Sequence, residues 1–347
     1  MKRFQTIYTL VFTLLLLNFS AYALLDTFSI SRVYQVVSQE PTVSPAVETA
    51  AVTEADTAES DEAEALPQPL QSHRPARGPG SGKHPAQGGG TQANGASQTE
   101  APTPAEMAAD TSFYSDDDLS VEIRTCRLAD TTVYVADIRV SSPALLKTAF
   151  ARSSYGRNVT ASTSATAESV GAVLAVNGDN YGSRERGYVI RNGVLYRDTA
   201  AKGQEDLVIW ADGSFEIIRE DEVTAQELLD RGAVQVFSFG PGLLEDGEIT
   251  VGTQDEVDRA MASNPRTAIG ILGEGHYVLV VSDGRSGESE GLSLYELAVF
   301  MQSLGVQTAY NLDGGGSSTL VFRGEVLNNP SGRGSGERAV TDIVYLA

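Results

Sequence analysis

The chain has 347 residues, of which 46 are acidic and 25 are basic, so its formal net charge at pH 7 is -21. This charge excludes non-specific binding to nucleic acid and to anionic lipid, both of which repel an acidic protein. The single cysteine, Cys126, rules out an intrachain disulfide, and the three histidines are too few and too scattered for a multi-histidine zinc site.

Residues 1–37 are expected to form a membrane anchor and a juxtamembrane segment. Lys2 and Arg3 precede Ile7–Leu25, which contains no charge and approaches the ~20 residues that span a bilayer. A cleaved signal peptide is the alternative, because Ala21–Ala23 fits a signal peptidase site. The apolar run continues through Leu25, so the sequence favours an uncleaved helix. We expect a single-pass protein of the cell membrane with its main domain outside the cytoplasm; the alternative is secretion after cleavage near Ala23.

Residues 38–112 are expected to form a disordered linker. The first half is acidic, the second half is rich in Pro, Gly, Ser and Gln, and no aromatic residue lies between Tyr34 and Phe113. Such a segment buries too little apolar surface to offset the entropy cost of ordering it. The composition therefore predicts a flexible stalk.

Residues 113–347 are long enough for one folded domain with its own core. Asn192-Gly193 and Asp212-Gly213 each separate two strand-like runs, as expected for β-hairpins. Thr224–Glu227 and Ser293–Glu296 are capping boxes that begin short helices, and 162–169 is a third short helix. Further strands are expected at 121–128, 132–140, 171–176, 234–239, 267–272, 277–282, 319–323 and 343–346. Many hairpins and few helices predict an α+β domain with a largely antiparallel or mixed sheet.

The stretch Tyr310–Thr319 carries the clearest functional signal. An apolar run ends at Asp313, and three glycines and three hydroxyl residues follow it: Gly314, Gly315, Gly316, Ser317, Ser318 and Thr319. Glycine lets a ligand approach bare backbone, and exposed N–H and hydroxyl groups suit an anion or a sugar. A tight turn between two strands is the alternative interpretation.

Other loops repeat this design of an apolar strand followed by polar residues among glycines. Together with Tyr310–Thr319 they supply four carboxylates and three arginines: Asp179, Asp283, Asp313, Glu337, Arg266, Arg285 and Arg338. Paired carboxylates are typical of glycoside hydrolysis, and arginine beside them suits a phosphorylated substrate. If the leaving group is a phosphate ester, a single carboxylate acting as base or nucleophile suffices.

Five motifs, taken in chain order, resemble the phosphodiester glycosidase family, whose bacterial members include exopolysaccharide-related proteins. They are Ala-Val-Asn-Gly (175–178), Pro-Arg-Thr-Ala-Ile-Gly (265–270), Asp-Gly-Arg-Ser (283–286), Asn-Leu-Asp-Gly-Gly-Gly-Ser-Ser-Thr (311–319) and Glu-Arg-Ala-Val (337–340). The resemblance covers roughly Gly171 to Ala347. It implies hydrolysis of a sugar–phosphate glycosidic bond. This chain departs from the family pattern in one loop. The family commonly has aromatic residues after Asn-Gly-Gly, whereas here Asn177-Gly178 is followed by Asp179-Asn180-Tyr181.

The expected activity is therefore hydrolysis of a glycosyl-1-phosphodiester in a cell-surface or exopolysaccharide glycan. We assign catalysis to Asp313, Glu337 and Asp283, with Glu337 as the second acid or base. Substrate binding is assigned to Asn177, Asp179, Arg266, Arg338, the three glycines and the three hydroxyl residues. No cofactor is expected; a divalent cation held by Asp179, Asp283 and Asp313 is the alternative. The alternative function is a non-catalytic surface protein that binds or assembles glycans on the same fold.

Overall fold

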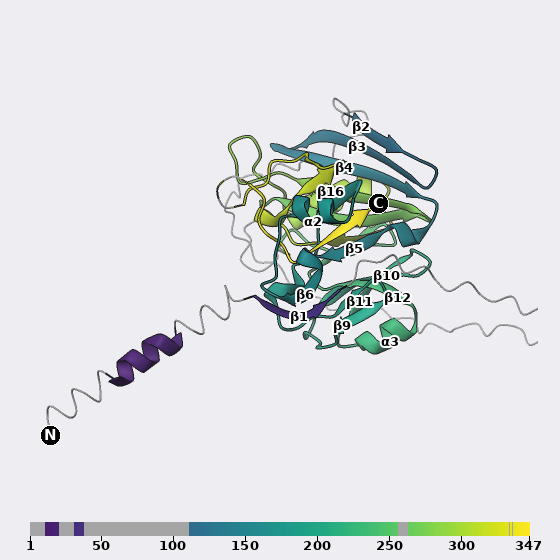
Figure 1. The fold of residues 1–347 in the computed structure, drawn as a ribbon. Helices are drawn as coiled ribbons and strands as arrows, with labels where there is room; N and C mark the ends of the chain where they lie inside the picture. Colours follow the sequence, from purple (N-terminus) through teal and green to yellow (C-terminus); the bar gives the residue numbers. More distant parts are fainter. Residues whose placement is uncertain (1–10, 21–30, 38–110, 256–262, 333, 335) are drawn as a thin grey trace, which may run out of the picture. The chain divides into compact units, whose positions relative to one another are not determined.

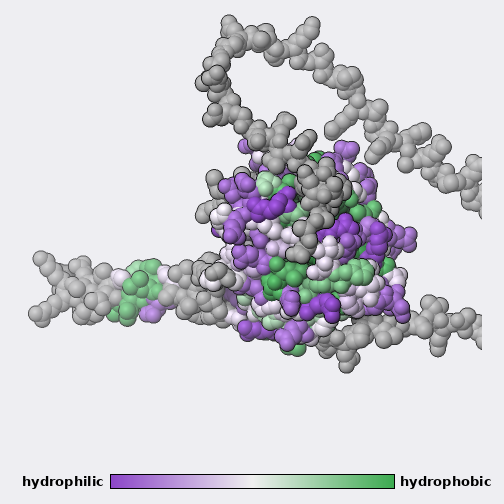
Figure 2. Space-filling view, turned by 90° about the horizontal axis from the view of Figure 1, so that it is seen from above, coloured by the Kyte–Doolittle hydropathy of each residue, from purple (hydrophilic) through white to green (hydrophobic). Residues whose placement is uncertain are grey.

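The structure is a computed structural model that describes residues 11–20, 31–37, 111–255, 263–332, 334 and 336–347. Residues 11–20 are helical and predominantly hydrophobic (Figures 1 and 2). None of the helices that the structure describes is both long and apolar enough to traverse a bilayer. The rest of the expected anchor, and almost all of the expected linker, lie outside the described residues.

The largest sheet of the folded part has eight antiparallel strands in the order β14-β13-β17-β15-β16-β4-β3-β2 (Figure 1). The strands are β2 (Thr111–Ser115), β3 (Leu119–Leu128), β4 (Thr131–Val140), β13 (Gly242–Glu245), β14 (Glu248–Ile249), β15 (Arg266–Gly273), β16 (His276–Ser282) and β17 (Thr308–Asn311).

Two further sheets have five antiparallel strands each, in the orders β11-β10-β12-β8-β9 and β19-β18-β7-β20-β5. The first consists of β8 (Val189–Arg191), β9 (Val194–Arg197), β10 (Glu205–Trp210), β11 (Phe215–Arg219) and β12 (Ala233–Phe237). The second consists of β5 (Lys147–Phe150), β7 (Leu174–Asn177), β18 (Leu320–Phe322), β19 (Glu325–Val326) and β20 (Asp342–Leu346). A separate two-stranded ribbon pairs β1 (Arg32–Val36) with β6 (Ser154–Arg157).

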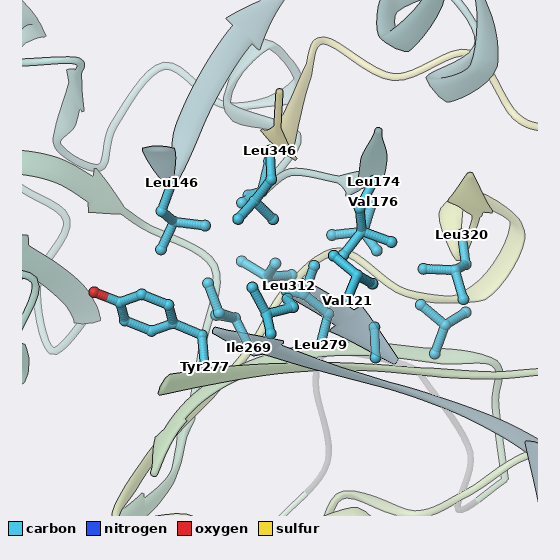
Figure 3. Close-up of a cluster of buried hydrophobic side chains, with 14 of the residues drawn as sticks. Val121, Leu146, Leu174, Val176, Ile269, Tyr277, Leu279, Leu312, Leu320 and Leu346 are labelled. Carbon is cyan, nitrogen blue, oxygen red and sulfur yellow. The ribbon is translucent and has the colours of Figure 1, made fainter. Parts of the chain in front are cut away.

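One shared core joins the three sheets. Alternate residues of a strand point to opposite faces, so Leu279 of β16 enters this core while Val280 faces the other way. Val176 from β7 and Ile209 from β10 meet Leu279 in the same cluster. Figure 3 shows part of this core, with side chains from the eight-stranded sheet facing those of β7, β18 and β20.

A helix covers the outer face of each sheet. The helix α4 (Leu294–Ser303) packs its buried residues on the second face of the eight-stranded sheet. The helices α3 (Ala225–Asp230) and α2 (Thr163–Ser169) cover the sheets of β10 and β7 in the same way. Both expected capping boxes form, at Thr224 and Ser293.

The observed fold confirms the α+β prediction with mainly antiparallel pairing. The sequence did not indicate how the strands divide into separate sheets. β1 was also unexpected, because it comes from the segment assigned as juxtamembrane and pairs with a strand beyond the expected linker.

Candidate active site

The loops predicted to be functional meet because their strands end at the same edge of the fold. Arg266 at the start of β15 pairs with Ser282 at the end of β16. Ala268 pairs with Asn311 at the end of β17. The segments around 265, 283 and 313 are therefore neighbours, although about fifty residues of sequence separate the first from the last.

Asn177 links these loops. Its side-chain nitrogen donates to the backbone oxygen of Asp313 at 2.6 Å, and its side-chain oxygen accepts from Thr267 Oγ1 and from the backbone N–H of Thr319. The side chain is fully buried. Asn177 therefore fixes both ends of the glycine-rich turn. Its nitrogen also donates to the Gly178 carbonyl oxygen, so both N–H groups and the oxygen of this amide are engaged within the protein.

Asp313 lies at the beginning of this turn and is 7% exposed. Burial raises the pKa of its carboxyl group, while the Ser317 hydroxyl and the positive charges of Arg338 and Arg184 oppose that shift. Its Oδ2 is buried and has no hydrogen-bond partner in the described part of the chain, and the same holds for the nearby Ser318 Oγ. A buried polar atom without a partner is costly, so these two atoms point to a ligand or water that would satisfy them.

Two arginines lie against the glycines. A Cβ atom added to Gly315 would lie 2.8 Å from Nη2 of Arg285, and one added to Gly316 would lie 3.2 Å from Nε of Arg338. Gly315 also has a positive φ of 62°, which favours glycine over residues with a side chain. The triple glycine therefore makes room for two guanidinium groups directly beside the backbone.

Arg285 and Arg338 are exposed residues, and hydrogen bonds hold both guanidinium groups in a defined position. Arg285 donates through Nε and Nη2 to Oδ1 of Asn264, and Nη1 of Arg338 donates to Ser317 Oγ at 3.4 Å. Among the described residues of 111–255 and 263–347, which leave out 333 and 335, neither arginine has a carboxylate partner within salt-bridge distance. Two such guanidinium groups beside one turn form a favourable site for an anion.

Asp283 is close to the site but its oxygens are engaged. Oδ1 accepts from the backbone N–H of Asn329 at 2.8 Å and from the Asn328 side chain at 3.4 Å, and Oδ2 accepts from the Tyr134 hydroxyl at 3.5 Å. Burial raises the pKa of Asp283, and these three donors oppose the shift. Asp283 therefore holds the 328–329 loop against the site.

Three other predicted residues point elsewhere. Arg266 is 3% exposed and donates through Nε to the carbonyl oxygen of Leu292. Glu337 accepts from the backbone N–H and the hydroxyl of Ser164 and so caps the start of α2. These contacts favour positioning roles for both residues over direct contact with a substrate.

Asp179 is the third, and it belongs to a fully enclosed ionic group. Nη2 of Arg191 lies 2.7 Å from Asp179 and 2.8 Å from Asp342, and all three side chains are at most 2% exposed. Burial and the Asp179 charge raise the pKa of Asp342 to about 7, against the opposing effect of Arg191. A Cβ on Gly178 would lie 2.5 Å from the Asp342 carboxyl carbon, so glycine is required there. This group is adjacent to the site, because the backbone N–H of Asp313 donates to the carbonyl oxygen of Gly178, the residue before Asp179.

Asp179 contacts Arg191, so Asp179, Asp283 and Asp313 do not converge on a common position for a cation. Among the residues that the structure describes, no group of three or more His, Cys, Asp or Glu side chains is placed to hold a metal ion.

Sequence reasoning placed Arg285 in a polar turn without including it among the substrate-binding residues, and it missed Arg184. Arg285 adopts a φ of 60°, which no local pattern indicated. Arg184 lies over the Phe239 ring at 5.0 Å and contributes positive charge near Asp313. The only possible signal for Arg184 was the polar run that follows Tyr181.

Comparisons with known proteins agree with the motifs. The family model described as phosphodiester glycosidase matches residues 170–347, half of the chain. The SPbeta prophage-derived uncharacterized protein YomE of Bacillus subtilis (strain 168) is 34% identical over 181 residues, 51% of this chain and 28% of that protein. The N-acetylglucosamine-1-phosphodiester alpha-N-acetylglucosaminidase of Mus musculus is 31% identical over 159 residues, 42% of this chain and 30% of that protein. The matched part thus spans less than a third of these relatives.

A solved structure is similar over more of the chain. The catalytic domain of the zebrafish enzyme of the same name, auto-inhibited by its pro-peptide, is 25% identical with a TM-score of 0.54. The match covers 68% of this chain and 87% of that one.

Proposed function

Because this chain belongs to the phosphodiester glycosidase family, we propose that it hydrolyses a glycosyl-1-phosphodiester in a cell-surface or exopolysaccharide glycan, outside the cytoplasm. The observation that carries this proposal is the position of one buried carboxyl group, Asp313, on a turn flanked by two guanidinium groups. A carboxylate and an anion site side by side suit a sugar linked to phosphate.

The phosphate binds to Arg285 and Arg338. Both side chains lie beside the triple glycine, where the missing Cβ atoms let phosphate oxygens approach the backbone. Charge-assisted hydrogen bonds from two guanidinium groups then stabilise the negative charge that builds up as the bond to the sugar breaks. Arg285 takes the role that the sequence suggested for Arg266.

Asp313 acts as the general base. A water molecule attacks the anomeric carbon, the bond from that carbon to the phosphate oxygen breaks, and the phosphate monoester leaves with the bonding electrons. The proton of the water passes to the Asp313 carboxylate. Burial raises the pKa of this carboxyl group, which makes it a stronger base than an exposed aspartate. The phosphate leaves readily as an anion, so a second carboxyl group is not needed to protonate it.

The extracytoplasmic location rests on the N-terminal sequence. Lys2 and Arg3 precede an uncharged apolar stretch, the arrangement that leaves the basic end in the cytoplasm and exports the remainder of the chain. The single-pass anchor proposed here keeps the enzyme on the cell membrane, where surface glycans are synthesised and remodelled.

The test uses the purified full-length chain and an N-acetylglucosamine-1-phosphodiester, the substrate class that names the mouse relative. The expected result is release of free sugar and of the phosphate monoester in equal amounts. Saturable binding of this diester without release of sugar would overturn the proposal and support the glycan-binding alternative.

A further inference from the structure

The ribbon of β1 and β6 joins two parts of the chain that the sequence places far apart. Arg32 pairs with Arg157, Val33 with Gly156, Gln35 with Tyr155 and Val36 with Ser154. Contacts continue at both ends, because Ser31 Oγ donates to the Asn158 carbonyl oxygen and the Val37 N–H donates to the Ser153 carbonyl oxygen at 2.8 Å. Seven consecutive residues, 31–37, are therefore held along β6.

The pairing depends mainly on the backbone. Val33, Tyr34 and Val36 are each more than half exposed, so most of the side chains of β1 bury little surface. Two side chains do contact the domain: the Tyr34 ring lies 5.9 Å from that of Tyr155, and Val37 packs on the cluster of Phe150, Tyr155, Tyr181 and Val189. This is the pattern of strand addition, in which backbone hydrogen bonds supply affinity and a few side chains supply specificity.

The domain side of the ribbon is shaped for this strand. A Cβ on Gly156 would overlap the Arg32 carbonyl oxygen and lie 2.9 Å from the Cα of Val33. β6 has no other partner strand in the described part of the chain, so without β1 its edge groups would lack backbone partners. Figure 1 shows β1, in purple, lying beside β6 on the surface of the folded part.

We propose that β6 is a strand-addition site for the chain's own segment 31–37, and that this docking holds the folded domain close to the apolar N-terminal stretch. Residues 26–31 separate Leu25 from β1, and an extended chain of that length spans about 20 Å. If residues 38–110 form the flexible stalk that their composition predicts, that stretch has a root-mean-square length of roughly 50 Å. The docked strand therefore replaces a long tether by a short one, and on an anchored chain it confines the enzyme to the bilayer surface. This last point rests on the proposed membrane location.

Docking in the same chain does not require a tight interaction. A tethered segment has an effective concentration on the order of millimolar at its site. An intrinsic dissociation constant of about 0.1 mM would then keep β1 bound for roughly nine-tenths of the time. A short strand with two anchoring side chains is sufficient.

Cysteine cross-linking in the full-length chain tests the docking. The only native cysteine, Cys126, is buried and its thiol pKa is raised to about 11 by burial, so it contributes little background reaction. We expect Arg32→Cys with Arg157→Cys to form a disulfide at least tenfold faster than Arg32→Cys with Arg219→Cys, a control on an exposed arginine of another sheet. Equal rates for the two pairs would overturn the proposal.

Two further changes to the cross-linking pair separate docking from domain folding. Gly156→Val blocks the site, whereas Gly273→Val places the same side chain where no atom lies within 4 Å of its Cβ. Tyr34→Ala with Val37→Ser weakens the strand without altering β6. We expect Gly156→Val and the Tyr34/Val37 pair each to slow the disulfide several-fold, and Gly273→Val to leave it unchanged. A wild-type rate in the Tyr34/Val37 variant would contradict docking even if Gly156→Val failed to fold.

The distance to the membrane is measured with the single tryptophan, Trp210, as energy donor. The full-length chain is reconstituted into vesicles that carry an acceptor dye on the lipid headgroups. We expect the Tyr34/Val37 variant to transfer less energy than the wild type, because its domain is free to move away on the longer tether. Equal transfer, or failure of the chain to enter the vesicles, would overturn the membrane-proximal placement. Neither readout involves hydrolysis, so these results are independent of the proposed activity.

Discussion

The substitution Asp313→Asn removes the proposed base while it keeps the shape of the side chain. The carboxyl group is 7% exposed and its Oδ2 has no described partner, so the change breaks no hydrogen bond at that atom. We expect the free energy of unfolding to change by less than about 2 kcal/mol. The activity should respond far more strongly, because general base catalysis contributes about 10²–10⁴ in rate, or roughly 3–5 kcal/mol.

The assay is kcat/KM for release of sugar from an N-acetylglucosamine-1-phosphodiester as a function of pH. Burial raises the pKa of Asp313, and only the deprotonated form accepts a proton. Wild-type kcat/KM should therefore rise with pH along a limb whose midpoint lies above 3.8, the ordinary value for this group. The variant should lack this limb. If Asp313→Asn keeps kcat/KM within tenfold of the wild type, Asp313 is not the base.

Four further outcomes are expected from the same geometry. Arg285→Ala and Arg338→Ala should each lower kcat/KM by about 10–150-fold, the value of one hydrogen bond to a charged group, whereas Arg219→Ala on β11 should not; a change below threefold in both would argue against phosphate binding there. Asp283→Asn should lower the melting temperature, because it weakens the contacts that hold the 328–329 loop, yet leave kcat within tenfold; a larger loss with an unchanged melting temperature would make Asp283 catalytic. Arg191→Met leaves Asp179 and Asp342 buried without their cation and should lower the free energy of unfolding by about 3–5 kcal/mol in urea titrations; a loss below about 1 kcal/mol would contradict this. Folding raises the pKa of the Asp342 carboxyl group to about 7, so the folded protein binds a proton at this group more tightly than the unfolded chain does. The stability that results from this proton is fully present below about pH 4 and is lost as pH rises through about 7. Asp342→Asn should reduce this dependence of the free energy of unfolding on pH.

The sequence indicated where the candidate site lies because the residues of this candidate site belong to local motifs. Asp313 and the three glycines form one continuous turn, and Asn177 follows a buried strand, so both could be recognised without knowledge of the fold. The repeated hairpin signals likewise predicted antiparallel pairing. These features depend on neighbours in sequence, and the structure retains them.

Side-chain direction was harder to predict, because it depends on contacts that are distant in sequence. Arg266 and Arg285 both lie in loops at the same edge, but only Arg285 reaches the glycine turn, since Arg266 donates to Leu292. Glu337 belongs to the motif at 337–340, but its carboxylate accepts a hydrogen bond from the backbone N–H of Ser164, which is distant in sequence. Asp179 is buried in an ion pair with Arg191, a residue that lies outside all five motifs. Composition could not reveal β1 either, because its partner lies more than a hundred residues away.

The place of β20 has a consequence for how the protein folds. This strand, Asp342–Leu346, lies between β7 and β5 in its sheet, and Asp342 also belongs to the ionic group of Asp179 and Arg191. Its two neighbours, β5 and β7, lie more than 160 residues earlier in the chain, so this sheet and the ionic group are complete only when distant segments have come together. Pairings between distant residues also form slowly. We therefore expect completion of the site to be one of the slow steps of folding.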